Sequence, residues 1–155
     1  MSIVKNPNPI LRQKTLPIAA KDIVSPEIKK VVAELKKTII ETADAVGLAG
    51  PQIGVNKQIF AVKLPEEKEV RIFINPELLE ASKRTAIDEE GCLSMPRLFG
   101  TVSRARTVTV KALDEHGKKI KIRAKGLLAR VLQHEIDHLS GRLFIDKAER
   151  TFKLT

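Results

Sequence analysis

The 155-residue sequence lacks several kinds of residue, and each absence narrows what the chain can be. It has one cysteine, no tryptophan and no tyrosine. A single cysteine cannot form an internal disulfide, which favours a reducing, cytoplasmic compartment. No apolar run approaches the roughly 20 residues that a membrane span requires. The first ten residues match neither a signal peptide nor a transit peptide, so we expect no membrane partner.

What the chain does contain is typical of one small globular domain. It is 43% apolar and 30% charged, with a formal net charge of +9, and it shows no repeat or linker. We therefore expect a single domain over residues 1–155. The positive charge permits attraction to phosphate, but base-stacking platforms need clustered aromatic residues, so a sequence-specific nucleic-acid partner is not expected. The aromatic residues are scattered phenylalanines at Phe60, Phe73, Phe99, Phe144 and Phe152.

Hydrophobic periodicity predicts an α+β fold. A long early helix is predicted over residues 26–45, with Ser25 as its N-cap and apolar residues at helical spacing up to Val46. Two hairpins are predicted, one pairing 58–64 with 70–74 and one pairing 107–113 with 118–124.

A further short strand is expected near Cys92, and a late helix is predicted from Gly126 to just before Gly141. The proline-rich opening segment is expected to be extended or turn. We expect antiparallel strands packed around the late helix.

The late helix contains His134-Glu135-Ile136-Asp137-His138, an H-E-x-x-H motif. A spacing of four residues places the two imidazoles about 40° apart on one helix face, so both can reach one metal ion. Glu135 falls within the apolar arc of the same helix, where a carboxylate is costly unless it is paired or functional. Burial would raise its pKa toward working pH, which suits a general base that later acts as an acid.

A third metal ligand must come from elsewhere in the chain. Phe144 occupies the position of the third histidine in the metzincin pattern and cannot ligate. Glu149 lies near the chain end, and His116 lies in a turn that we expect to face solvent. Cys92 is the remaining soft donor, and two imidazoles with one thiolate leave a fourth position open for water, as in catalytic sites.

Three segments together carry a family resemblance. The segments GLAGPQIG (47–54), EGCLS (90–94) and QHEIDHLSG (133–141), in this order, resemble the signature motifs of the peptide deformylases. The resemblance runs from Asn6 to Ile145 and implies a small α+β enzyme. The implied activity is metal-dependent removal of the formyl group from the N-formylmethionine of nascent polypeptides, with release of formate.

The resemblance also implies roles for individual residues. It assigns Glu135 as the acid/base, and Gln52 together with the backbone N–H of Leu93 as donors to the developing oxyanion. The family commonly uses Fe²⁺, and Zn²⁺, Ni²⁺ or Co²⁺ can occupy the site. The metal ligands implied by the motif match are Cys92, His134 and His138.

Substrate recognition would need an apolar pocket for the methionine side chain. Val46, Leu127 and Val131 are our candidates for its walls. The peptide backbone could pair with a strand edge near Gly47 or Gly91, where a missing side chain permits close approach.

Two features depart from the family pattern. The first motif has Ala45 and Ala49-Gly50 where relatives have glycine and two alanines, which we expect to alter flexibility and not chemistry. Only residues 146–155 follow the core, where many relatives carry a longer helix that some use for ribosome contact. That docking mode is in doubt, and an electrostatic association with ribosomes remains open.

Two other functions compete with this hypothesis. A small metalloprotease would share the H-E-x-x-H chemistry, but it gives Cys92 and Gln52 no role. A basic RNA- or ribosome-binding module without catalysis would use the charge alone. Release of formate from formyl-Met-Ala separates these alternatives.

Overall fold

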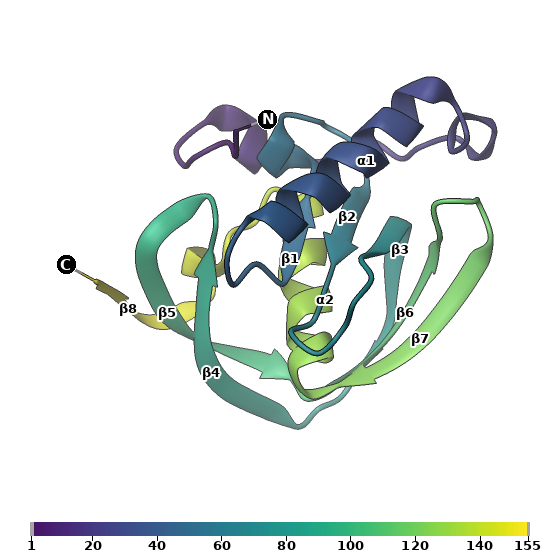
Figure 1. Ribbon diagram of the computed structural model, residues 1–155. Helices are drawn as coiled ribbons and strands as arrows, with labels where there is room; N and C mark the ends of the chain where they lie inside the picture. The colour runs from purple at the N-terminus through teal and green to yellow at the C-terminus, as the bar shows by residue number, and fades with distance from the viewer. Residues whose placement is uncertain (1, 155) are drawn as a thin grey trace.

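The computed structural model describes residues 2–154, so Met1 and Thr155 of the expected domain lie outside the described part (Figure 1). Two α-helices are present over these residues, α1 (Pro26–Glu41) and α2 (Gly126–Leu139). The strands are β1 (Gly47–Ala49), β2 (Ile59–Val62), β3 (Arg71–Ala81), β4 (Thr85–Cys92), β5 (Met95–Ala105), β6 (Thr107–Leu113), β7 (Lys119–Lys125) and β8 (Ala148–Lys153). This confirms the α+β expectation.

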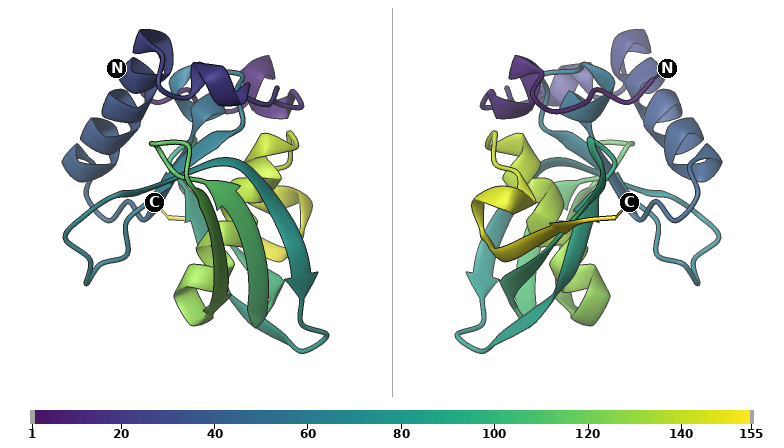
Figure 2. Two further views of the ribbon diagram at one scale, coloured as in Figure 1. Left: turned by 90° about the vertical axis from the view of Figure 1, so that its right-hand side faces the viewer. Right: turned by 90° about the vertical axis from the view of Figure 1, so that its left-hand side faces the viewer.

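The strands form two antiparallel sheets around α2. The larger sheet has the order β1-β2-β3-β6-β7, and the smaller has the order β4-β5-β8. The left view of Figure 2 turns the outer face of the larger sheet toward the viewer and shows α2 behind that sheet. Among the described residues, no helix combines enough length and apolar character to cross a lipid bilayer.

Strand β2 is buried on both faces, which explains its continuous apolar run Ile-Phe-Ala-Val. Side chains alternate along a strand, so Phe60 packs in the cluster with α2 while Ile59 packs in the cluster with α1. Phe60 also stacks on Phe73 of β3, with ring centroids 5.1 Å apart. The sheet therefore fixes α2 on one side and α1 on the other.

Helix α1 begins as predicted but ends earlier. The Ser25 hydroxyl accepts a hydrogen bond from the Ile28 N–H at 3.3 Å, as an N-cap should. The prediction that the helix continues to residue 45 is wrong, because Thr42 turns extended and its hydroxyl donates back to the Thr38 carbonyl at 2.6 Å. Asp44 then adopts a positive φ of 62°. Val46 therefore lies outside the helix and faces the pocket described below.

The other predicted elements agree with the structure apart from their lengths. The β6–β7 hairpin and α2 lie within one residue of the expected boundaries. Strand β3 continues past the predicted end to Ala81 with two register irregularities, and the short strand expected near Cys92 is the end of the eight-residue β4. The opening segment contains two short 3₁₀ turns, Pro9–Arg12 and Ala20–Asp22.

An ion pair ties this opening segment to the chain that follows α2. The Asp146 carboxylate accepts hydrogen bonds from Arg12 Nη2 at 3.1 Å and from the Leu143 N–H at 3.0 Å. The hydrogen bond from Arg12, and then that from Leu143, lower the pKa of Asp146 below its usual value. The stabilisation is therefore present above the unfolded-state pKa and is lost as the pH falls through the folded-state pKa.

We predict that Asp146→Asn lowers the free energy of unfolding at pH 7 by at most about 1 kcal/mol, because the pair is partly exposed and screened. The difference from the wild type should shrink below about pH 4. Urea unfolding at several pH values measures it. Glu149→Gln removes a neighbouring exposed carboxylate as a matched control, and an equal effect of that substitution would contradict the prediction.

Candidate active site

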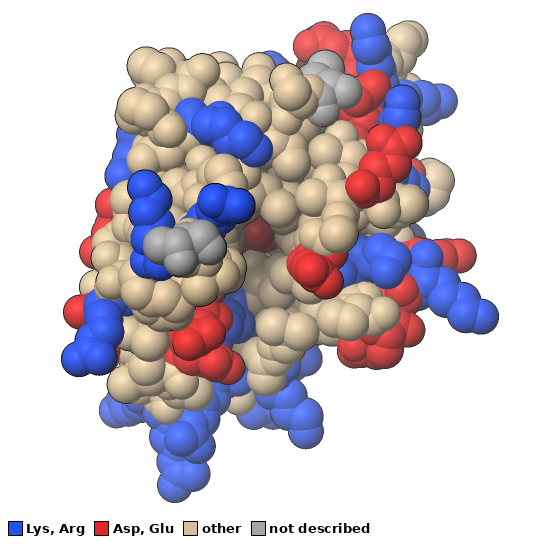
Figure 3. Space-filling view, turned by 60° about the vertical axis from the view of Figure 1, so that its left-hand side comes forward, with Lys and Arg blue, Asp and Glu red and all other residues tan. Residues whose placement is uncertain are grey.

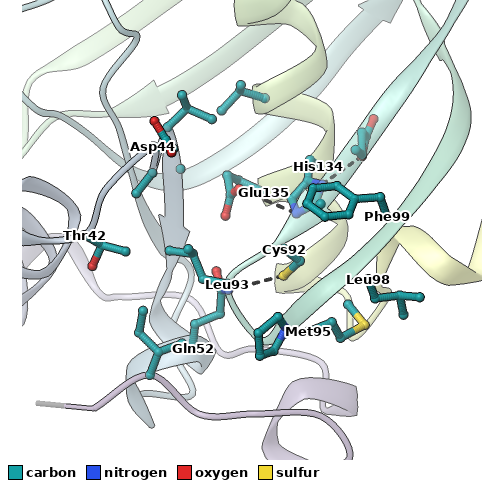
Figure 4. A pocket seen from close by; sticks show the side chains of 18 of the residues that line it. Thr42, Asp44, Gln52, Cys92, Leu93, Met95, Leu98, Phe99, His134 and Glu135 are labelled. Atoms are coloured by element: carbon teal, nitrogen blue, oxygen red, sulfur yellow. Dashed lines mark hydrogen bonds and ion pairs between the residues drawn. The ribbon is translucent and has the colours of Figure 1, made fainter. Parts of the chain in front are cut away.

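A cavity of about 500 Å³ opens between the α1–β1 loop, β4, β5 and α2. Figure 3 shows the hollow on this face, with acidic atoms at its floor. The three sequence segments with unusual motifs all contribute to its lining, although they are far apart along the chain. Figure 4 shows Gln52, Cys92, Leu93, His134 and Glu135 grouped around the same space.

Cys92, His134 and His138 come together at one side of this cavity. Their potential ligand atoms all lie within 4.8 Å of one another. His134 and His138 are one helical turn apart on α2, and their ring centroids are 5.0 Å apart. Cys92 is the last residue of β4, just after a register shift in the ladder, and its Sγ lies 3.4 Å from His138 Nε2. Burial lowers the pKa of His138 well below its usual value, which favours the neutral imidazole.

His134 is oriented by a buried carboxylate, Glu90, that the sequence analysis did not single out. His134 Nδ1 lies 2.8 Å from Glu90 Oε1. Because this contact engages Nδ1, the other ring nitrogen is the one available to a metal, as in carboxylate–histidine–metal arrangements. Burial lowers the pKa of His134, but hydrogen bonds with Cys92 and Glu90 and the charge of Glu135 outweigh this and raise it to about 10.

Two arginines compensate the charge of Glu90. Arg104 donates two hydrogen bonds of 2.9 Å to its carboxylate, and Arg130 donates a third of 2.7 Å. Burial alone would raise the pKa of Glu90, yet the hydrogen bonds from Arg104 and His134 hold it well below its usual range. Arg104 also donates to Asp137 Oδ2 at 2.6 Å, so the network joins β4, β5 and α2.

Glu135 lies in the opposite kind of environment. It is 3% exposed, and burial raises its pKa to about 7. Its Oε1 atom has no hydrogen-bond partner among the described residues, and its Oε2 lies 3.9 Å from His134 Nε2. Gly47 of β1 makes room for this side chain, since a Cβ there would lie 2.5 Å from Glu135 Oε2.

Gln52 is fixed with its amide nitrogen toward the cysteine. Its Oε1 accepts a 2.9 Å hydrogen bond from the Ala49 N–H. Its Nε2 consequently points toward Cys92 Sγ at 3.5 Å and donates to Ser94 Oγ at 3.1 Å. Leu93 lines the cavity beside it, and its carbonyl accepts a 3.1 Å hydrogen bond from Lys5 Nζ.

The residues expected around the methionine side chain also line the cavity: Val46, Gly47, Gly91, Leu127 and Val131. Leu127 is 48% exposed and lies at the mouth of the cavity, whereas Val131 is 5% exposed and lies on its inner wall. Gly91 lies against Phe99, where a Cβ would come within 2.9 Å of the ring. His116 and Glu149, the other candidate ligands, are exposed residues of the β6–β7 turn and of β8.

The sequence analysis missed Glu90, Ser94, Arg104 and Arg130. Glu90 and Ser94 stand at the two ends of the EGCLS segment, so a signal was present beside Cys92. No local pattern marks Arg104, because its partners lie 14 and 33 residues away in the chain.

The donor set fits a divalent metal ion that binds thiolate and imidazole. Two imidazoles and a thiol beside a buried carboxylate, in an open cavity of a small α+β domain, define the class of mononuclear metallohydrolases. The sequence matches the model of the polypeptide deformylase family over residues 1–153, and the chain belongs to this family. Its members are enzymes that remove the formyl group from nascent peptides.

Relatives of known family support this assignment over nearly the whole chain. A peptide deformylase of Halothermothrix orenii is 46% identical over 97% of this chain and 94% of its own length. One of Thermomicrobium roseum is 44% identical over 96% of this chain and 85% of its own.

Solved structures agree with the fold. A class I type b peptide deformylase from Acinetobacter baumannii superposes with a TM-score of 0.89 at 34% identity, covering 95% of this chain and 97% of that one. The Synechococcus elongatus enzyme in complex with actinonin gives 0.87 at 34% identity, over 97% of this chain and 79% of that one.

We predict that Glu90→Ala lowers the free energy of unfolding by about 3–5 kcal/mol, because it leaves Arg104 buried without its main partner. Metal affinity should fall by about 10–100-fold because His134 loses its orienting contact. Urea unfolding and metal titration measure the two effects.

Glu80→Ala, on the exposed part of β3, is the matched control and should change neither quantity. If Glu90→Ala does not fold, Glu90→Gln keeps the shape of the side chain and tests the charge alone. Wild-type metal affinity in a folded Glu90→Ala protein would contradict the orienting role, and wild-type affinity in Glu90→Gln would show that the charge of Glu90 is not required.

Proposed function

We propose that this enzyme removes the formyl group from the N-terminal N-formylmethionine of newly synthesised polypeptides and releases formate. We further propose that Cys92, His134 and His138 hold one divalent metal ion, with Fe²⁺ as the native ion and Zn²⁺, Ni²⁺ or Co²⁺ as alternatives. The observation that carries the proposal is the position of the buried Glu135 beside these three donors at the floor of the cavity. When bound, the metal supplies Lewis acidity, which lowers the pKa of water and stabilises negative charge on oxygen.

Glu135 is proposed as the acid/base. Its carboxylate accepts a proton from the attacking water as the new C–O bond forms at the formyl carbon. It returns that proton to the methionine nitrogen as the C–N bond breaks, so that formate and a free amine leave. A pKa raised to about 7 by burial supports both halves of this cycle, because both protonation states are accessible near neutral pH.

Gln52 and Leu93 are proposed to stabilise the charge that develops on the formyl oxygen. The amide orientation of Gln52 is fixed through Ala49, so its Nε2 donor is aimed before substrate binds. The backbone N–H of Leu93 is the second proposed donor. Fixed donors of this kind typically contribute about 3 kcal/mol each to transition-state stabilisation.

The methionine side chain is proposed to lie against Val46, Leu127 and Val131. The cavity volume of about 500 Å³ leaves room for the main chain of the following residues. The peptide backbone is proposed to pair with the strand edges at Gly47 and Gly91. The space that their missing side chains leave is taken by Glu135 and Phe99. We propose action in the cytoplasm, with an electrostatic association with ribosomes supported by the net charge of +9.

We predict that Glu135→Gln lowers kcat/KM for formate release from formyl-Met-Ala by about 10²–10⁴-fold, the usual contribution of general acid–base catalysis. The metal content should stay at the wild-type level, because Glu135 is not one of the proposed ligands. Glu149→Gln serves as the control and should keep full activity. Full activity in Glu135→Gln would exclude the proposed role.

We predict that Cys92→Ser loses its bound metal, because a serine hydroxyl replaces the thiolate that neutralises part of the metal charge. Elemental analysis after anaerobic purification and dialysis measures the metal-to-protein ratio, and circular dichroism checks the fold. A folded Cys92→Ser protein that retains one ion per chain would show that Cys92 is not a ligand.

A further inference from the structure

The exposed side of β7 carries a row of positive charge that plays no part in the site described above. Side chains alternate along this strand, so Ile120, Ile122 and Ala124 pack toward the α2 core. The strand contains no acidic residue. We call the four exposed cations of this strand the basic row: Lys119, Lys121, Arg123 and Lys125.

The neighbouring strand does not neutralise the basic row. Its cross-strand partners on β6 are Leu113, Lys111, Thr109 and Thr107, none of them acidic. Lys111 stands directly opposite Lys121, and like charges in that position are destabilising. Within residues 2–154, no member of the row forms an ion pair or a side-chain hydrogen bond, whereas Lys111 pairs with Glu77 at 3.3 Å.

Protection of a sheet edge explains only part of this arrangement. β7 is one of the two edge strands of the larger sheet, and lysines on edges prevent pairing with other chains. That role does not require four cations at alternate positions of one strand, and acidic side chains on β6 would not interfere with it. The structure therefore retains an unfavourable charge distribution that a polyanion would relieve.

The row is long enough to meet several phosphates of a duplex. Alternate residues of a strand lie about 6.8 Å apart, so its four charges extend over about 20 Å. Phosphates wind around a duplex, so a straight row of this length crosses its phosphate backbones and does not follow a single strand. At the Lys125 end of the row, the β3–β4 turn packs beside β6 through backbone hydrogen bonds from Ser82 to Thr107 and from Arg106 to Arg84. Three further exposed cations extend the basic surface there: Lys83, Arg84 and Arg106.

We infer that the basic row docks the phosphodiester backbone of double-stranded RNA. The inference deepens the proposed function, because a nascent chain is attached to an assembly rich in folded RNA. The row lies on the outer face of the larger sheet, which the left view of Figure 2 turns toward the viewer. The cavity opens on a different face, which Figure 3 shows. Docked RNA would leave the cavity accessible. RNA is favoured over a membrane surface because the exposed side chains of β7 include no aromatic or aliphatic residue for insertion.

The test measures binding to a 20-base-pair RNA duplex of mixed sequence by fluorescence anisotropy between 50 and 200 mM KCl. We expect the double variant Lys121→Glu/Arg123→Glu to bind at least tenfold more weakly at 50 mM KCl. The slope of log K against log salt should fall by about 2, close to 0.9 for each lost phosphate contact. The control Lys29→Glu/Lys30→Glu makes the same charge change on the exposed side of α1 and should bind within about threefold of the wild type.

Release of formate from formyl-Met-Ala should be unchanged in both double variants, which shows that they are folded and separates this test from that of the proposed function. Equal weakening by the two pairs would show that net charge alone binds RNA and would overturn the inference. Absence of wild-type binding at 50 mM KCl would also overturn it, as would binding to phosphatidylserine vesicles in place of RNA.

Discussion

The active-site cavity depends on the buried carboxylate of Glu90. It lies on β4, and its hydrogen bonds reach Arg104 on β5 and both Arg130 and His134 on α2. Four charge-assisted contacts on one carboxylate offset the cost of taking it out of water. These contacts fix the position of α2 relative to the smaller sheet. Because Cys92 follows Glu90 by two residues, the same contacts place the thiol beside the histidines.

Two of the buried carboxylates, those of Glu90 and Glu135, have pKa values shifted in opposite directions, and this difference separates their proposed roles. Donors surround Glu90 and hold its pKa well below its usual range, whereas Glu135 is buried with one oxygen unpaired among the described residues and has a pKa raised to about 7. Consecutive residues on a helix point about 100° apart, so α2 directs His134 toward Glu90 and Glu135 toward Gly47. One carboxylate can therefore orient a ligand while its neighbour remains free to exchange a proton.

Local apolar periodicity carried most of the fold prediction, which failed where a side-chain contact or a long-range strand pairing decides the structure. Helix α2 and the β6–β7 hairpin were predictable because their apolar periodicity and turn residues lie within each segment. The end of α1 was not, since a side-chain contact from Thr42 to Thr38 stops a pattern that continues to Val46. The pairing of β8 with β5 joins segments about 50 residues apart and leaves no periodic signal.

The same limit applies to the site. Cys92, His134 and His138 were recognisable as candidate metal ligands because soft donors are scarce, and three of the four cysteine and histidine side chains gather at one place. Arg104 was not, because the chain has 28 basic residues and the sequence does not tell which of them is buried. Its role appears only when folding brings it 2.9 Å from Glu90.

The distribution of charge follows from the chemistry of the proposed substrate. A formylated amine carries no positive charge, so the cavity can recognise it with apolar walls and fixed hydrogen-bond donors and needs no acidic residue as counter-ion. Glu135, the proposed acid/base, then need not form an ion pair with the substrate. The excess of basic residues that gives the net charge of +9 can therefore lie outside the cavity. Four of these residues form the basic row on the outer face of the larger sheet. Recognition of the peptide and attraction to a polyanion are thus assigned to separate faces, which lets one proceed without occupying the other.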